Sequence, residues 1–86
     1  MRVNMKYFFR VIKETVPEEA FSAIRALYTE TYRSRFTDTT RCGQRTWTDF
    51  LTEMYSLDVV KPYAVVIHHK LVQFGPAVIL ATLLTQ

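Results

Sequence analysis

The residues best suited to binding chemistry gather between positions 33 and 45. This segment holds four arginines against one aspartate, an excess equal to the net charge of +3 carried by the whole chain. The basic and aromatic residues are Arg33, Arg35, Phe36, Arg41 and Arg45. Arginine binds carboxylates and phosphates through paired hydrogen bonds, and a neighbouring aromatic ring can stack on a nucleobase. The segment is therefore a candidate site for an acidic protein surface or for nucleic acid.

Two observations favour the acidic protein surface over nucleic acid. A net charge of +3 is modest for a nucleic-acid-binding domain, and no RNA-recognition aromatic motif, GXXG loop or zinc-finger spacing accompanies the arginines. The simplest alternative is a solvated loop whose arginines give solubility or pair with Glu30, Asp38 and Asp49. Binding of RNA or single-stranded DNA through the same arginines is the second functional hypothesis.

Nucleophilic or metal chemistry has only Cys42 and the adjacent pair His68 and His69 to draw on. The charge of Arg41 favours a thiolate at Cys42, which would make it reactive if exposed. However, nothing in the spacing brings the thiol to a histidine, and neither a second cysteine nor a carboxylate cluster is placed to complete a metal shell. The carboxylates are scattered along the chain. We therefore predict no enzymatic activity, no metal and no cofactor.

These side chains must be positioned by one small domain, residues 1–86, because 86 residues are fewer than most single domains contain. Apolar residues make up 49% of the chain, which predicts a folded core. A lone cysteine favours a reducing, cytoplasmic location. Charged residues interrupt the first ten positions, which argues against a secretory signal. The longest uncharged run, residues 71–86, is shorter than the roughly 20 residues of a membrane span.

The first half of the chain predicts a strand, two helices and a loop. Apolar residues at odd positions between 3 and 13 indicate a half-buried strand. Apolar residues spaced by three and four predict one helix from about residue 18 to residue 34 and another beginning at Thr46. Between the helices, residues 36–45 lose this period and collect polar residues and a glycine, which is typical of a loop.

The second half predicts further strands. Residues 63–67 are β-branched and aromatic, and two more apolar runs, 71–74 and 78–84, flank a predicted turn at Gly75 and Pro76. Residues 77–84 also fit a helix entered through Pro76, which is kept as an alternative. The predicted order is β-α-α-β-β, with or without a further strand. This is an α+β fold in which two amphipathic helices pack on one face of a small, mainly antiparallel sheet.

The predicted carboxy-terminal strands are apolar on both faces, although two helices cover only one face of a sheet. A large exposed apolar patch is rare on a monomer, so we predict a homodimer that forms through these strands. The residues assigned to self-association are Val65, Ile67, Leu71, Val78 and Leu80. The function predicted from the sequence is that of a small interaction protein of the inhibitor or accessory-subunit type.

Overall fold

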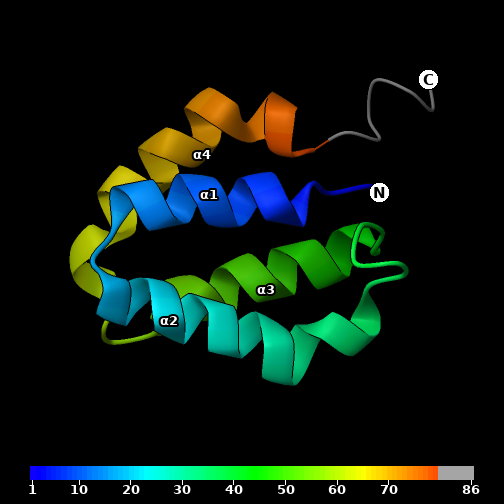
Figure 1. The fold of residues 1–86 in the computed structure, drawn as a ribbon, viewed down its shortest axis with the longest axis horizontal. Helices are drawn as coiled ribbons and strands as arrows, with labels where there is room; N and C mark the ends of the chain where they lie inside the picture. Colours follow the sequence, from blue (N-terminus) through cyan, green and yellow to red (C-terminus); the bar gives the residue numbers. More distant parts are fainter. Residues whose placement is uncertain (80–86) are drawn as a thin grey trace.

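The computed structural model describes residues 1–79 and shows four α-helices, each antiparallel to the one before it (Figure 1). The helices are α1 (Met5–Thr15), α2 (Glu18–Leu27), α3 (Gln44–Ser56) and α4 (Ala64–Val78). A π-helical turn η1 (Tyr28–Tyr32) and a 3₁₀ turn η2 (Arg33–Arg35) continue α2, and a second 3₁₀ turn η3 (Lys61–Tyr63) precedes α4. Helical residues make up 76% of the described chain.

The predicted α+β fold is therefore wrong. Residues 1–79 contain three isolated β-bridges but no strand and no sheet. The strand predicted over residues 3–13 is helix α1, whose N-terminus is capped by Asn4 Oδ1 accepting from the amide of Tyr7 at 3.0 Å. Because α1 packs against both α2 and α4, a broad arc of its surface is apolar, and this arc produced the alternating pattern.

The strands predicted over residues 63–67 and 71–74 are also wrong, because η3 and α4 occupy this part of the chain. Gly75 and Pro76 lie inside α4 rather than in a turn. Ile67 and Val78 are buried on the inner side of the helix, so the apolar run is one helical stripe rather than two strand faces. Of the last predicted strand, Val78 ends α4, and residues 80–84 lie outside the described residues.

The helix predicted from about residue 18 to residue 34 is confirmed, and it runs as α2, η1 and η2 to Arg35. Within it, the amide of Arg33 donates to the carbonyl of Tyr28, five residues earlier, which is the hydrogen bond of a π turn. The second predicted helix is also present and begins at Gln44, two residues before Thr46. Both helices follow the apolar spacing expected from the sequence.

The core centres on Phe50 of α3, which is 0% exposed. Its ring meets Phe8 of α1 at a centroid distance of 5.7 Å. It also meets Tyr28 and Tyr32 of the π turn at 6.0 and 5.4 Å and Trp47 of α3 at 5.8 Å. Most of these contacts are edge-to-face, the arrangement that aromatic quadrupoles favour. One aromatic side chain thus joins α1, η1 and α3.

The first residues of the chain tie the loop between η2 and α3 to the end of α4. The backbone groups of Met1 and Cys42 exchange two hydrogen bonds, each of 2.9 Å. The amide of Val3 donates to Thr40 at 2.6 Å, and the amide of Asn4 donates to Val78 at 2.7 Å. None of the helices within residues 1–79 has the length and apolar character to cross a membrane.

The first prediction concerns the turn at the tip of this loop. Asp38 and Thr39 have positive φ angles of 55° and 60°, and threonine is a poor residue for this conformation. We expect Thr39→Gly to raise the free energy of unfolding by about 1 kcal/mol, measured by urea unfolding. Thr37→Gly is the control, because Thr37 has no positive φ and the substitution should lower stability. Equal effects of both variants would contradict this account.

The second prediction concerns the aromatic core. Phe50→Ala leaves a cavity where four rings meet, and we expect a loss of about 3–5 kcal/mol in the free energy of unfolding. Thr48→Ala is the control, since Thr48 is exposed on the same helix and its truncation should change stability by less than about 0.5 kcal/mol. Thermal unfolding followed by circular dichroism measures both. A Phe50→Ala protein that melts with the parent would disprove the central role of this ring.

Candidate anion-binding site

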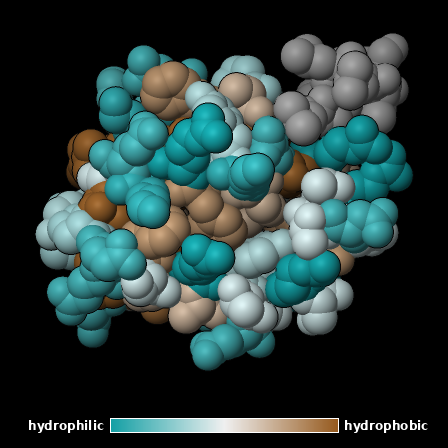
Figure 2. Space-filling view, viewed as in Figure 1, coloured by the Kyte–Doolittle hydropathy of each residue, from teal (hydrophilic) through white to brown (hydrophobic). Residues whose placement is uncertain are grey.

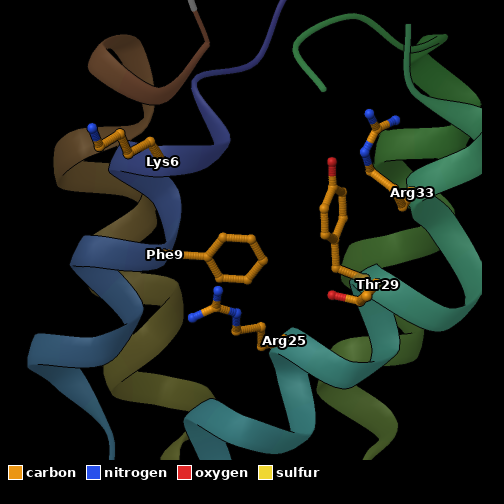
Figure 3. A pocket seen from close by; sticks show the side chains of 6 residues that line it. Lys6, Phe9, Arg25, Thr29 and Arg33 are labelled. Carbon is orange, nitrogen blue, oxygen red and sulfur yellow. The ribbon is translucent and has the colours of Figure 1, made fainter. Parts of the chain in front are cut away.

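A pocket of about 440 Å³ lies between α1 and the continuous helical stretch α2–η1–η2 (Figure 3). This size is typical of pockets that take a small ligand or a few side chains. We call it the basic pocket, and its lining residues are Lys6, Phe9, Arg25, Tyr28, Thr29 and Arg33. Three of the six are cationic and two are aromatic, and the described lining includes no carboxylate, histidine or cysteine.

The side chains of the pocket come from two helices that face each other. In Figure 3 the Phe9 ring of α1 lies in the middle, and Arg25 reaches from α2 toward α1 beside it. Arg33 lies further along the same helical stretch, beyond Thr29. Lys6 extends along the rim on the α1 side, with its ammonium group turned outward. The two arginines therefore flank an aromatic centre, and the flexible lysine can swing toward an incoming anion.

The π turn places Tyr28 and Arg33 in the same pocket. In a regular α-helix, residues five positions apart point in different directions, whereas a π turn brings them nearly above one another. The hydrogen bond from the Arg33 amide to the Tyr28 carbonyl marks this turn. Single π turns inside helices are common at functional sites. Here the π turn places Arg33 on the same side of the pocket as Arg25.

The three cations of the pocket lie outside the ion pairs of the described residues. The ion pairs within residues 1–79 join Arg35 and Arg45 to Asp49, and Lys61 to Asp58. None of these pairs includes Lys6, Arg25 or Arg33. Their three positive charges lie around one hollow beside two aromatic rings, which raises the local positive potential. The pocket is therefore suited to attract an anion.

Tyr28 provides a polar group that is unsatisfied in the protein alone. Its side chain is 7% exposed, and its Oη has no hydrogen-bond partner among the described residues. Burial raises the pKa of Tyr28, while the charge of nearby Arg33 acts in the opposite direction. The hydroxyl is therefore a neutral donor at physiological pH, close to one of the pocket arginines. A buried hydroxyl without a partner lowers stability and suggests a role in binding.

The surface around the pocket is strongly polar. Figure 2 shows the face formed by α1 and α2, with less polar atoms in its middle and hydrophilic side chains around them. This arrangement resembles a small binding site, in which an apolar centre is surrounded by groups that fix the orientation of a ligand.

The arginines predicted from the sequence do not form one site. Arg33 lines the basic pocket, but Arg35 donates to Thr46 and Asp49 at 3.1 and 3.4 Å and lies over the ring of Tyr32. Arg45 also approaches Asp49, at 3.9 Å. Arg41 is exposed in the loop. These three arginines lie outside the pocket lining.

Phe36, predicted to contact a partner, instead belongs to the core. It is buried, and its ring packs against Tyr28 at a centroid distance of 5.2 Å. The solvated-loop alternative therefore describes Arg35 and Arg45 correctly, because both pair with Asp49 as that alternative expected.

Sequence reasoning missed Lys6, Phe9, Arg25, Tyr28 and Thr29 as members of a site. A signal was present for part of it, since Arg25, Thr29 and Arg33 are spaced by four and share one side of the predicted helix. The contribution of α1 was hidden, because Lys6 and Phe9 lie three residues apart and point the same way only in a helix. The assignment of a strand to this segment put them on opposite faces.

The residues considered for nucleophilic or metal chemistry do not form a site. Cys42 is buried, and burial raises the pKa of its thiol, although the amino terminus and Arg35 act in the opposite direction. The thiol is therefore protonated at neutral pH and poorly reactive. His68 lies at a separate groove between α3 and α4. No group of three or more potential metal ligands comes together within residues 1–79.

The residues predicted for self-association differ in burial and do not share one surface. Ile67 and Val78 are buried in the core, and Leu71 is half-buried beside α3. Val65 alone is exposed in the way that a contact residue should be, and Leu80 lies outside the described residues. The face of α4 that meets solvent is therefore not the face that the predicted strands would have presented.

Comparison with known proteins adds no further information on the site. No family model matches the chain, and no curated protein or solved structure shows significant similarity to it.

The third prediction tests the unsatisfied hydroxyl. Tyr28→Phe removes a buried oxygen without a partner and keeps the ring, so we expect the free energy of unfolding to rise by about 1 kcal/mol. Tyr32→Phe is the matched control, because Tyr32 Oη donates to Glu53 at 2.8 Å and its loss should lower stability by about 1 kcal/mol. Urea unfolding of both variants measures whether each substitution raises or lowers the free energy of unfolding. Destabilisation by Tyr28→Phe would show that the hydroxyl is satisfied.

Proposed function

We propose that this protein is a non-enzymatic interaction protein that binds an acidic segment of a partner protein in the basic pocket. The observation that supports this proposal is that Lys6, Arg25 and Arg33 line one pocket and lie outside the ion pairs of the described residues. Arginine and lysine in a partly apolar pocket bind carboxylates by charge-assisted hydrogen bonds, which are stronger than those between neutral groups.

The shape of the pocket favours one or two acidic side chains over a nucleic-acid strand. Proteins that bind single strands combine a basic groove along the backbone with exposed rings for successive bases. Here the cations line a single hollow. Tyr28 is 7% exposed, and Phe9 packs edge-to-face against it at a centroid distance of 5.5 Å. These rings offer little free face for stacking, so they serve better as an apolar wall around a carboxylate.

Binding of RNA or single-stranded DNA is the alternative function. Its support is the pairing of Phe9 with the two arginines, because one unstacked base could lie against the accessible part of the ring. This alternative predicts an affinity that falls steeply with salt, roughly one power of salt concentration for each phosphate contacted.

A binding role also fits the chemistry of the described residues. The pocket lining has no general base or nucleophile, and the buried Cys42 thiol is held in its protonated form. We assign the protein to the cytoplasm, where a lone unpaired thiol stays reduced. An inhibitor or accessory subunit of an acidic partner would have these properties.

The fourth prediction tests the basic pocket with defined probes. Fluorescence anisotropy measures binding of a labelled glutamate-rich peptide, and of labelled oligo-dT and oligo-U, to the parent and to Arg33→Glu. We expect the parent to prefer the peptide and Arg33→Glu to weaken peptide binding at least about tenfold, because a charge-assisted hydrogen bond is lost and repulsion replaces it.

Arg45→Glu is the matched control, since it makes the same change in net charge at a residue outside the pocket. We expect it to change peptide affinity by no more than about twofold, as a rim charge does. Equal losses in the two variants would show that net charge alone attracts the peptide. Tighter binding of oligo-dT or oligo-U than of the peptide would favour the alternative function.

A further inference from the structure

The basic pocket offers more positive charge and more hydrogen-bond donors than a single carboxylate can use. Its lining holds Lys6, Arg25 and Arg33, and all three residues are exposed. Each arginine carries five N–H donors and the lysine three, whereas a carboxylate has two oxygens and one negative charge. Within residues 1–79, the one hydrogen bond that these cations donate runs from Arg33 Nη1 to the Phe36 carbonyl, at 3.3 Å. Most of the donors are therefore available to a ligand.

These donors lie on two walls around one hollow (Figure 3). Arg25 and Arg33 belong to the α2–η1–η2 stretch, with Thr29 between them, and Lys6 lies on the α1 side. Thr29 is exposed and adds a hydroxyl, which can also donate a hydrogen bond. The described lining has no carboxylate that would repel a second negative charge. An anion in the hollow thus meets donors from more than one direction.

A phosphate monoester matches this arrangement better than a carboxylate does. It carries a charge of about −1.5 to −2 at pH 7 and three oxygens that accept strong hydrogen bonds. One arginine can occupy both oxygens of a carboxylate in a two-point pair, which leaves the remaining cations without an acceptor. The three oxygens of a phosphate can be shared among both arginines and the lysine. The lining therefore favours a doubly charged anion with three acceptor oxygens.

The aromatic side chains of the pocket limit what can carry the phosphate. Phe9 packs edge-to-face against Phe21 and Tyr28 at centroid distances of 6.2 and 5.5 Å, and Tyr28 is buried. These rings leave little free face for the ring of a phosphotyrosine or for a nucleobase. The cations are exposed, so a phosphate on a short aliphatic side chain can reach them from the surface. Phosphoserine and phosphothreonine have such side chains.

We infer that the basic pocket binds a phosphorylated serine or threonine within the acidic segment of the partner protein. Arg25 and Arg33 bind the phosphate by paired hydrogen bonds from one wall, and Lys6 contributes its charge from the other. This inference rests on the proposed function and names the side chain that is recognised. Binding then depends on whether the partner is phosphorylated.

The fifth prediction compares labelled acidic peptides that differ at one central position only. The variable residue is phosphoserine, glutamate or serine, and fluorescence anisotropy measures each dissociation constant. We expect the parent to bind the phosphoserine peptide at least about tenfold more tightly than the glutamate peptide, because the added charge and the third oxygen meet donors that a carboxylate leaves unused. A phosphoserine peptide that binds no more tightly than the glutamate peptide overturns the inference.

Arg25→Gln tests whether the preference for phosphoserine arises in the basic pocket. Glutamine removes the charge but is compatible with the helix at this exposed position. We expect the preference for phosphoserine over glutamate to fall to about threefold or less. Arg45→Gln is the matched control, because it makes the same change in net charge outside the pocket and should leave the preference unchanged.

Lys6→Gln is a second variant, on the other wall of the pocket, and should also reduce the preference. Far-UV circular dichroism shows whether each variant keeps its helical content, and Lys6→Gln decides the matter if Arg25→Gln does not. A preference that survives in both folded variants, or that falls equally in Arg45→Gln, overturns the assignment of the phosphate to this pocket.

Three further probes identify what carries the phosphate. They are inorganic phosphate, a phosphotyrosine form of the same peptide, and oligo-U with a 5′-phosphate. We expect each to bind more weakly than the phosphoserine peptide, because inorganic phosphate lacks the flanking acidic residues and the other two bring a ring that the pocket cannot stack. Inorganic phosphate as tight as the phosphoserine peptide, or tighter binding of either of the other two probes, overturns the inference.

The peptides also separate this inference from the proposed function. A glutamate peptide that binds the parent and is lost in Arg33→Glu, without a gain from phosphoserine, overturns the inference alone and supports the proposed function. A parent that binds neither the glutamate nor the phosphoserine peptide overturns both.

Discussion

The packing of aromatic rings around Phe50 is the interaction on which the rest of the structure depends. Phe50 reaches Phe8 of α1 and both tyrosines of the π turn, so three helical segments that are distant in sequence share one contact point. A chain this small buries only a modest share of its surface, and large rings supply much apolar contact from few residues. The positions of α1 and α2, and therefore of the pocket between them, follow from this cluster.

Tyr28 connects the core to the candidate binding site. One face of its ring belongs to the aromatic cluster, while its side chain also lines the basic pocket, and the π turn that begins there adds Arg33. The π turn and the unsatisfied hydroxyl both depart from the most stable arrangement of a helix and a core. Such departures are expected where a surface is shaped for binding rather than for stability alone.

The two sides of the molecule differ in the forces that they offer to a partner. The α1–α2 side presents cations around an aromatic hollow, which suits a charged group. The α3–α4 side instead presents an apolar groove whose described lining includes His68 but no acidic residue. Asp49 pairs with Arg35 and Arg45, whereas Arg25 of α2 and Arg33 of η2 lie outside the ion pairs of the described residues.

The sequence by itself determined the helices in the middle of the chain. In residues 18–34 and 47–55 the apolar side chains recur every three or four positions, which places them on one side of a helix and so predicts which of them are buried. It did not determine the helices at either end. Helix α1 lies between two neighbours, so its broad apolar arc resembled a strand, and the β-branched run and Gly75–Pro76 of α4 gave local signals that tertiary packing overrode. Tertiary structure alone decided the candidate site. Lys6 and Arg33 line one pocket only because α1 packs against α2, and two of the four arginines predicted from the sequence pair with Asp49 instead. Burial follows from the composition of each segment, whereas the grouping of charges depends on which distant segments the core brings side by side.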